Sequence, residues 1–324
     1  MTTRRRFMAL ALGSGLGAAI PFRTSAQEWP ARFVRIVVPF PVGAPPDIAS
    51  RMIASRLSEM WGQQVVVENR PGAGGNIGTA AVARANSDGY TVLMAAFTHA
   101  VNTFLYGSTG YDPIADFEPV TLVSEQPCVM IVPNASPAQS VSEFVAYAKS
   151  SKRNLTFASA GHGTSPHLCG ELFKRRTGIE MVHVPFTVGA QQDLMAGRVD
   201  VMFAVGASGI SLGASGRARV LAVTTARRVA AAPEVPTLAE SGLPGFDVAP
   251  WWGLFVPART PASIIAKMNA ATVATLAEPA VRAKLESLGS SAVGSTPSEL
   301  ARYLKNEMAK WGPVIRDARI TLDG

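Results

Sequence analysis

The sequence "IVVPFPVGAPPDIASRM", residues 36–52, decides the fold of this chain. It opens on a continuous apolar run, typical of a strand that is buried on both faces of a sheet. Three prolines and Gly43 then stiffen the turn, and a helical pattern follows from Asp47. A strand, a rigid turn and a helix in this order predict an α/β fold.

Nine further apolar runs repeat this pattern and indicate more strands. Most of them are continuous Val, Ile and Leu runs, and helical periods lie between them. This alternation predicts open mixed or parallel sheets with helices on both faces. The ten candidate strands are residues 34–39, 65–68, 91–97, 120–124, 129–132, 156–159, 181–184, 199–205, 220–224 and 252–256.

The first 26 residues have the pattern of a secretory signal peptide. An arginine triplet precedes an apolar run at residues 7–21, and small residues end at Ala26, where we expect cleavage. The run is shorter than the roughly 20 residues that a membrane-spanning helix needs. Arg4 and Arg5 suit the twin-arginine route as well as the general secretory route, and both stay open. We therefore expect an exported protein.

Export also changes the charge that a partner would meet. The signal segment holds four arginines and no acid, so its removal lowers the formal net charge from +7 to +3. The mature chain has no basic run interleaved with aromatic residues, which argues against a nucleic-acid-binding protein. Its two cysteines, Cys128 and Cys169, are expected either to form a disulfide or to remain buried thiols.

The length of the mature chain, about 298 residues, suggests two domains. The last quarter is mainly helical and has too few strands to be a domain alone, so we expect it to cover the earlier sheet. The prediction is a discontinuous first domain, 27–125 with 248–324, and an inserted second domain, 126–247.

Four strand ends carry the candidate ligand-binding residues, because ligands of open α/β sheets lie where helices begin. In "FASAGHGTSPHL", residues 157–168, two glycines allow a close backbone approach, and the helix start suits a carboxylate or phosphate. An ordinary strand–helix turn explains the same residues. The candidates are Phe40, Pro41, Val42, Gly43 and Asp47, then Phe97, Thr98 and His99, then Ser159, Gly161, His162, Gly163 and Thr164, and finally Thr187 and Gly189.

Signals for catalysis, cofactors and metals are weak. Residues 72–78, "GAGGNIG", have Ile77 where a dinucleotide-binding motif needs its last glycine, and no P-loop ending follows. The spacing of His162 and His167 does not indicate a metal site, and neither G-x-S-x-G nor H-E-x-x-H occurs. Ser159 or Ser165 could still act as the nucleophile of a secreted hydrolase, since triad partners meet only in space. We predict no cofactor and no bound metal.

Several long segments resemble one family, the periplasmic solute receptors of tripartite tricarboxylate transporters, also called Bug-type or TctC-type proteins. These include "IVVPFPVGAPPDIASRMIASRL", "VVVENRPGAGGNIGTAAVARANSDGYTVLM", "FASAGHGTSPHLCGELFK" and "VLAVTTARRVAAAPEVPTLAESGLPGF". The resemblance implies two α/β domains that close over a cleft, as in type II periplasmic binding proteins. It implies a monomer that captures a small organic acid for membrane permease subunits, with no catalysis.

The resemblance also assigns roles to two of the junctions. Residues 40–47, here called the lip, would hold one ligand end through backbone carbonyls, often through water, with Asp47 orienting the helix start or meeting a ligand donor. Residues 159–164, here called the anion turn, would hold the proximal carboxylate. A receptor that presents its ligand to a membrane sensor fits the same sequence.

Two departures from the family pattern concern the second domain. The loop at Phe186, Thr187, Val188 and Gly189 lacks the usual Tyr-Lys-Gly-Gly spelling and is about two residues short, and Ala204 stands where an acidic residue is common. Both changes remove polar groups. We therefore expect a more apolar pocket that takes a different or bulkier acid, such as an aromatic one.

Overall fold

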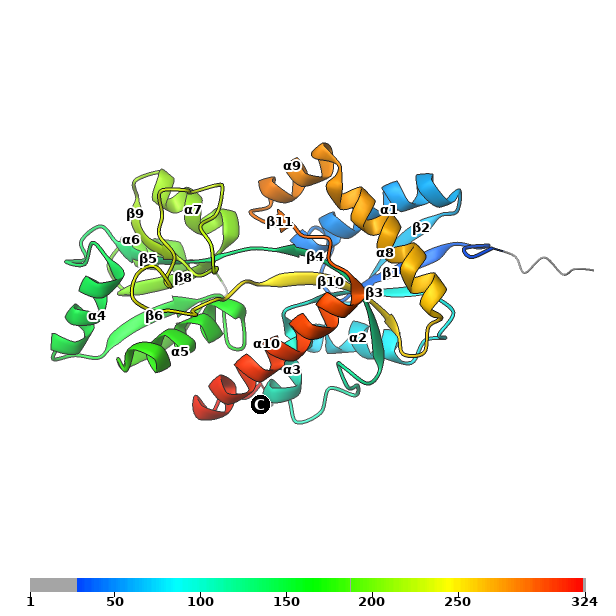
Figure 1. Ribbon diagram of the computed structural model, residues 1–324. Helices are drawn as coiled ribbons and strands as arrows, with labels where there is room; N and C mark the ends of the chain where they lie inside the picture. The colour runs from blue at the N-terminus through cyan, green and yellow to red at the C-terminus, as the bar shows by residue number, and fades with distance from the viewer. Residues whose placement is uncertain (1–27, 187, 323–324) are drawn as a thin grey trace, which may run out of the picture.

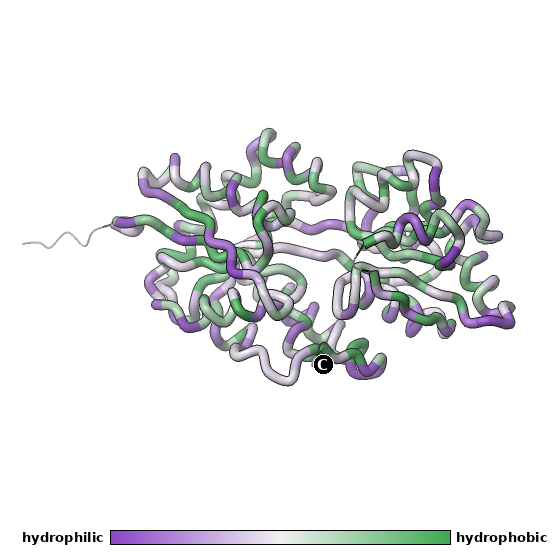
Figure 2. The backbone as a smooth tube through the Cα atoms, turned by 180° about the vertical axis from the view of Figure 1, so that it is seen from behind, coloured by the Kyte–Doolittle hydropathy of each residue, from purple (hydrophilic) through white to green (hydrophobic). Residues whose placement is uncertain are grey.

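The computed structural model describes residues 28–186 and 188–322, so the predicted signal peptide lies outside the described residues. The chain forms two α/β lobes, each built on one mixed sheet (Figure 1). Apolar residues concentrate in the strands inside both lobes, and polar residues lie on the outer helices (Figure 2). Among the described helices, none combines the length and apolarity needed to cross a bilayer.

The first sheet has the strand order β11-β4-β10-β3-β1-β2. Strand β1 pairs in parallel with β2 and β3, whereas β10 runs antiparallel to β3 and β4. Helices α1, α8 and α9 pack on one face, and α3 and α10 pack on the other. The elements are β1 (Val34–Val38), α1 (Pro45–Trp61), β2 (Val65–Asn69), the 3₁₀ turn η1 (Ala73–Gly75), α2 (Asn76–Ala83), β3 (Thr91–Ala96), α3 (Thr98–Leu105), β4 (Phe117–Glu125), β10 (Trp251–Pro257), α8 (Ala262–Ala277), α9 (Pro279–Ser287), β11 (Ser291–Ala292) and α10 (Pro297–Asp317).

The second sheet has the order β7-β6-β8-β5-β9, with β6 parallel to β7 and β8, and β5 antiparallel to β8 and β9. Helices α4 and α5 cover one face of it, and α6 and α7 cover the other. The elements are β5 (Cys128–Pro133), α4 (Val141–Ser150), β6 (Leu155–Ser159), α5 (Ser165–Thr177), β7 (Met181–Pro185), α6 (Ala190–Met195), β8 (Val201–Val205), α7 (Gly206–Ala214) and β9 (Ala218–Val223).

Two crossing segments join the sheets, and buried hydrogen bonds tie them together. The chain enters the second sheet between β4 and β5 and returns through residues 224–250. The Thr224 hydroxyl accepts from the Cys128 N–H at 2.9 Å and donates to the Val248 carbonyl at 2.6 Å. The Gln126 N–H also donates to the Pro250 carbonyl at 2.9 Å. These hydrogen bonds lie where both connecting segments pass between the lobes.

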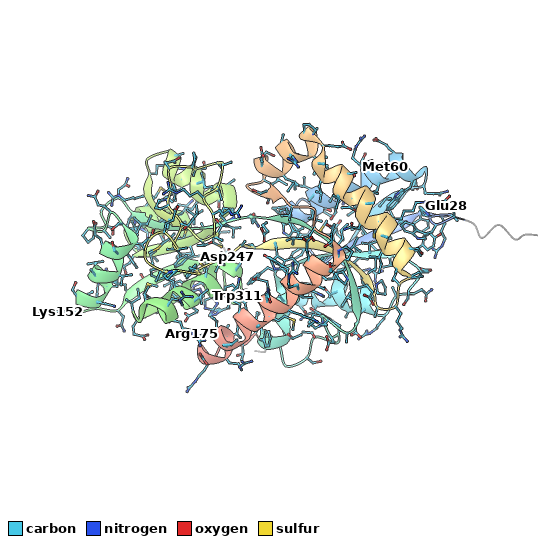
Figure 3. The ribbon with its side chains drawn as sticks, viewed as in Figure 1. Glu28, Met60, Lys152, Arg175, Asp247 and Trp311 are labelled. Carbon is cyan, nitrogen blue, oxygen red and sulfur yellow. The ribbon has the colours of Figure 1, made fainter. Side chains whose placement is uncertain are left out.

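Helix α10 also links the lobes. Trp311 is buried against Phe97, the residue between β3 and α3. The helix ends beside α5, where Asp317 forms an ion pair with Arg175 at 2.7 Å (Figure 3). The two cysteines are buried free thiols, and burial together with a hydrogen bond to Cys128 raises the pKa of the Cys169 thiol. Of the two open alternatives, the structure has the buried thiols.

Candidate ligand-binding site

The lip is held rigid by one buried carboxylate. Asp47 is 1% exposed, and its two oxygens accept hydrogen bonds from the Gly43 N–H at 2.9 Å and the Asn69 side chain at 2.9 Å. Arg51 adds an ion pair at 3.0 Å. Burial raises the pKa of Asp47, but these donors outweigh it and leave the pKa below its ordinary value. Asp47 therefore orients the lip and the start of α1.

The prolines and Gly43 explain how the lip keeps its shape. Gly43 has φ +82°, a left-handed conformation that favours glycine. The Phe40 carbonyl accepts from Asn69 at 3.1 Å, and the Pro41 carbonyl accepts from the Ala44 N–H at 3.2 Å. Val42 is 72% exposed at the tip. Two of the carbonyls expected to face a ligand thus already carry one internal hydrogen bond each.

The second junction differs from the prediction at His99. Thr98 is half-buried at the start of α3, but His99 is 2% exposed and packs on Tyr111, Phe117 and Phe255. Burial lowers the pKa of His99 to about 4, and its Nε2 bonds the Pro113 carbonyl at 3.1 Å. In this structure the His99 ring therefore belongs to the core, and ligand binding by His99 stays a prediction.

Phe97 also serves the core rather than a pocket wall. Its ring meets that of Trp311 with centroids 5.3 Å apart, and the side chain is 5% exposed. At this junction, Thr98 alone keeps a side chain that is not fully buried among the three predicted residues.

The anion turn joins β6 to α5 and is shaped by two glycines. Gly161 and Gly163 have φ +116° and +70°. The Gly161 N–H donates to the Ser159 hydroxyl at 3.1 Å, and the Thr164 hydroxyl donates back to the Gly161 carbonyl at 2.8 Å. Thr164 stands at the N-cap position of α5 but makes no side-chain cap bond. The first turn of α5 is thus left without a side-chain cap, as suits an anion.

Ser159 and His183 form a close pair that sequence spacing did not suggest. The Ser159 hydroxyl lies 2.6 Å from Nε2 of His183, a half-buried residue on β7. Nδ1 of His183 is buried and has no hydrogen-bond partner among the described residues. The pair therefore lacks the orienting carboxylate of a catalytic triad.

A hollow of about 520 Å³ opens beside the anion turn, and all its lining residues belong to the second lobe. It brings together three predicted residues, Ser159, Gly189 and Ala204. Thr187 lies outside the described residues. The hollow also includes residues that the sequence did not nominate, namely Ala160, Pro166, Phe186, Val188, Ala190, Gln191, Gln192, Met202, Phe203, Val205 and Ser208.

The lining of this hollow is largely apolar and carries no cation. Phe186, Val188 and Met202 supply apolar surface, and Gln191 and Gln192 supply neutral amides. None of the described lining residues is Lys or Arg. Gln191 and Gln192 lie on the first turn of α6, directly after the fourth junction. This position is the sequence signal that could have identified them as candidate site residues. No described lip residue lines this hollow, so it does not join the predicted residues of the two lobes.

Comparison with known proteins identifies the family. The model of the tripartite tricarboxylate transporter family receptor matches residues 49–320. The chain belongs to this receptor family. A protein from Pseudomonas sp. strain P51, described as a UPF0065 protein in the tcbD-tcbE intergenic region, is 40% identical over 98% of this chain and 95% of its own. Protein BugT of Bordetella pertussis is 33% identical over 93% of each chain.

Solved structures agree with the family. An R. palustris protein solved with adipate is 36% identical with TM-score 0.75, covering 91% of this chain and all of that one. MatC from Rhodopseudomonas palustris, solved with malate, is 34% identical with TM-score 0.72, covering 88% and 99%. A ligand-free solute-binding protein from Polaromonas is 25% identical with TM-score 0.81, covering 89% and 99%.

The family and these neighbours are substrate-binding receptors rather than enzymes. The hydrolase alternative is therefore set aside. The predicted fold, two α/β domains with mixed sheets, is confirmed both by the sheets and by the neighbours.

Proposed function

We propose that this receptor is exported to the periplasm, captures one small organic acid between its lobes and delivers it to a tripartite membrane permease. The observation that carries the proposal is the hollow, because it joins the anion turn to an apolar wall in one space. The turn would hold the carboxylate by backbone N–H groups and the α5 start, and the wall would hold the body of the acid.

The lobes would act as two rigid bodies, residues 27–125 with 248–324 and residues 126–247. The chain has a higher TM-score with the ligand-free neighbour than with the adipate-bound one, despite lower identity to it. This supports an open arrangement, in which lip and hollow are apart. Closure about a hinge at Thr224 would bring Phe40 to Gly43 over a bound acid. A monomer suffices for this cycle.

The character of the wall narrows the ligand class. Ala204 removes a carboxylate that would repel an anion, and Phe186 and Met202 offer surface to an apolar body. We propose that an acid with a large apolar or aromatic body binds more tightly than a small hydroxylated dicarboxylate.

Titration calorimetry on the mature protein tests this proposal. The panel is malate, adipate, benzoate and phthalate, with benzamide as the uncharged control. We expect saturable binding of an apolar acid and no binding of benzamide. The affinity for the apolar acid should be at least about tenfold above that for malate, which corresponds to about 1.4 kcal/mol of binding free energy. Tight binding of malate alone would overturn the apolar pocket, and binding of no acid would overturn the receptor proposal.

A charge placed in the hollow makes the test specific. Ala204→Asp should weaken binding of the preferred acid at least about tenfold, because a carboxylate then faces an anion. The matched control is Ala283→Asp on the exposed surface of α9, which adds the same charge outside the hollow. Equal affinities in both variants would show that the acid binds elsewhere.

Uptake measurements separate transport from sensing. Deleting this gene should abolish uptake of the labelled acid in cells that keep the permease. A loss of transcriptional response with uptake unchanged would favour the sensor alternative. Intact-mass measurement of the periplasmic protein should give a chain that begins at Gln27, and any other start would contradict cleavage after Ala26.

A further inference from the structure

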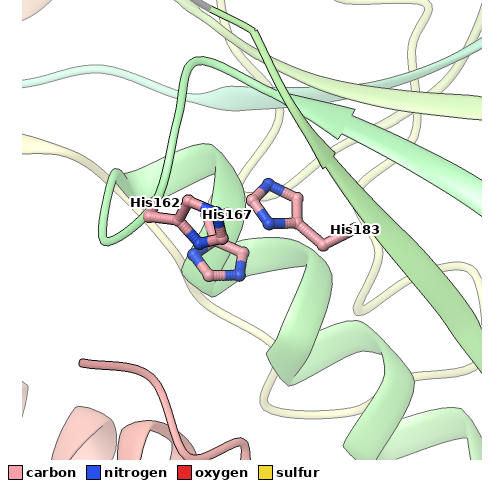
Figure 4. A group of neighbouring side chains, drawn as sticks. All are labelled: His162, His167 and His183. Atoms are coloured by element: carbon pink, nitrogen blue, oxygen red, sulfur yellow. The ribbon is translucent and has the colours of Figure 1, made fainter. Parts of the chain in front are cut away.

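Three of the four histidines in this chain gather at the anion turn. His162 comes from the turn itself, His167 from the first turn of α5, and His183 from β7 (Figure 4). One ring nitrogen of each lies within 4.8 Å of those of the other two. The rings of His167 and His183 stack at 3.7 Å, and the ring of His162 stands edge-on to both.

The fold, and not the sequence spacing, creates this cluster. Strands β6 and β7 pair in parallel with Phe157 opposite His183, so His183 is carried to the level of the anion turn. Strand β7 begins only after α5 has run back along the sheet, so His183 lies far from the other two in sequence. This explains why the spacing of His162 and His167 alone indicated no metal.

Each of the two inner rings has one nitrogen held by the protein. Nε2 of His183 bonds the Ser159 hydroxyl, which leaves the buried Nδ1 without a partner among the described residues. Nε2 of His167 lies 4.0 Å from the Glu171 carboxylate, and Nδ1 accepts from the Gly163 N–H at 3.0 Å. A histidine held at one nitrogen by a hydroxyl is oriented to bind a metal through the other, and this applies to His183. His167 can bind a metal through Nδ1 only if the hydrogen bond from Gly163 opens.

The charges around the cluster allow a cation to enter. Lys174 is the nearest cation of α5, but its ammonium bonds both oxygens of Glu171 at 3.1 and 3.0 Å, so the pair is close to neutral.

We propose that His162, His167 and His183 form a binding site for a divalent late transition metal, with Zn²⁺ as the first choice. Imidazole nitrogens favour zinc, copper and nickel over magnesium or calcium. Three nitrogens bound to one zinc would lie roughly 3.3 Å apart, given Zn–N bonds of about 2.0 Å. His162, which is exposed between Gly161 and Gly163, would move inward, and one of the stacked rings of His167 and His183 would turn so that both lone pairs meet the metal. The bond from Gly163 to His167 would open in the same movement.

The proposed site keeps one coordination position open. Three protein ligands and one open position are typical of exchangeable zinc sites. The position would be filled by water or by an external oxygen ligand. The proposal does not depend on the proposed function, because metal binding is measured without any organic acid.

The experiment uses the mature protein without a histidine tag, stripped with a chelator and dialysed. Zn²⁺ is titrated against a chromophoric competitor, and Co²⁺ is added separately to record visible absorption. We expect one saturable Zn²⁺ per chain and the intense visible bands of four-coordinate Co²⁺. An absence of saturable Zn²⁺ binding, or binding unaffected by the variants below, would overturn the proposal.

His162→Ala is the decisive variant, because this exposed side chain can be removed without a loss of core packing. It should lower Zn²⁺ affinity at least about 100-fold, since losing even an outer partner of a ligand costs 10- to 100-fold. His183→Gln should do the same and abolish the Co²⁺ bands. The matched control is His99→Gln, which removes the fourth histidine from the core of the other lobe and should leave Zn²⁺ affinity unchanged.

Discussion

Replacing Asp47 by asparagine tests how the lip is held. Asparagine keeps one carbonyl oxygen, so either the Gly43 N–H or the Asn69 amide loses its acceptor. A hydrogen bond to a charged group contributes about 1.5–3 kcal/mol. The ion pair with Arg51, whose side chain is 49% exposed, adds only about 0.5 kcal/mol. We therefore expect Asp47→Asn to lower the free energy of unfolding by about 2–3.5 kcal/mol.

Denaturant unfolding at pH 7 measures this loss, with Glu59→Gln as the control. Glu59 lies on the same helix and pairs with Arg56 on the surface, so its loss should cost under about 0.5 kcal/mol. The pKa of Asp47 is lowered in the folded state, so its contribution is present above pH 3.8 and is lost as the pH falls below that value. The difference between wild type and Asp47→Asn should shrink there. Equal losses in the two variants at pH 7 would refute the reasoning.

Two further substitutions test buried groups. The pKa of His99 falls from 6.5 to about 4 on folding, so the unfolded chain binds the proton first and acid favours unfolding. The wild-type protein should lose up to about 3 kcal/mol of stability through this group between pH 6.5 and 4, and His99→Gln should not show this loss. Thermal melts in which His99→Gln keeps the pH dependence of the wild type would contradict this. Thr224→Val leaves Cys128 N–H and the Val248 carbonyl unpaired between the lobes, so unfolding should require about 2–4 kcal/mol less. Thr225→Val removes a turn hydroxyl and should lower the free energy of unfolding by under about 1 kcal/mol in the same denaturation series. A loss as large as that of Thr224→Val would argue against the importance of the buried Thr224 hydrogen bonds.

The strands were predictable because burial on both faces leaves a continuous apolar run. All ten predicted strands are present, and their ends differ from the predicted ones by at most three residues. Strand β11, Ser291–Ala292, was missed because two residues carry no pattern of their own. It exists through antiparallel pairing with β4, and long-range pairing of this kind leaves no local signal.

The site was harder to predict because a residue's place at a strand end does not fix where its side chain points. His99 follows β3 as predicted, yet its ring enters the core among Tyr111, Phe117 and Phe255. The sequence places His183 on a strand without a site role, yet the register of β6 and β7 sets it opposite Phe157, and its ring there reaches the Ser159 hydroxyl. Strand pairing and the rotational position of a residue on its helix decide where these two side chains point. The neighbouring sequence does not specify either.

These placements change which groups are available to a ligand. The carboxylate of Asp47 is occupied by the lip, the Ser159 hydroxyl by His183 and Gly161, and the Thr164 hydroxyl by Gly161. Side chains that look like ligand contacts in the sequence instead hold the backbone in place. The backbone N–H groups of Gly161, Gly163 and Thr164 are also hydrogen-bonded internally, so the proposal relies on the remaining backbone N–H groups of the turn and of the α5 start. These groups are fixed by the fold and lose little freedom on binding. A small acid is best recognised by this arrangement when its carboxylate fits the turn and its body fits the wall, without any charged side chain from the hollow.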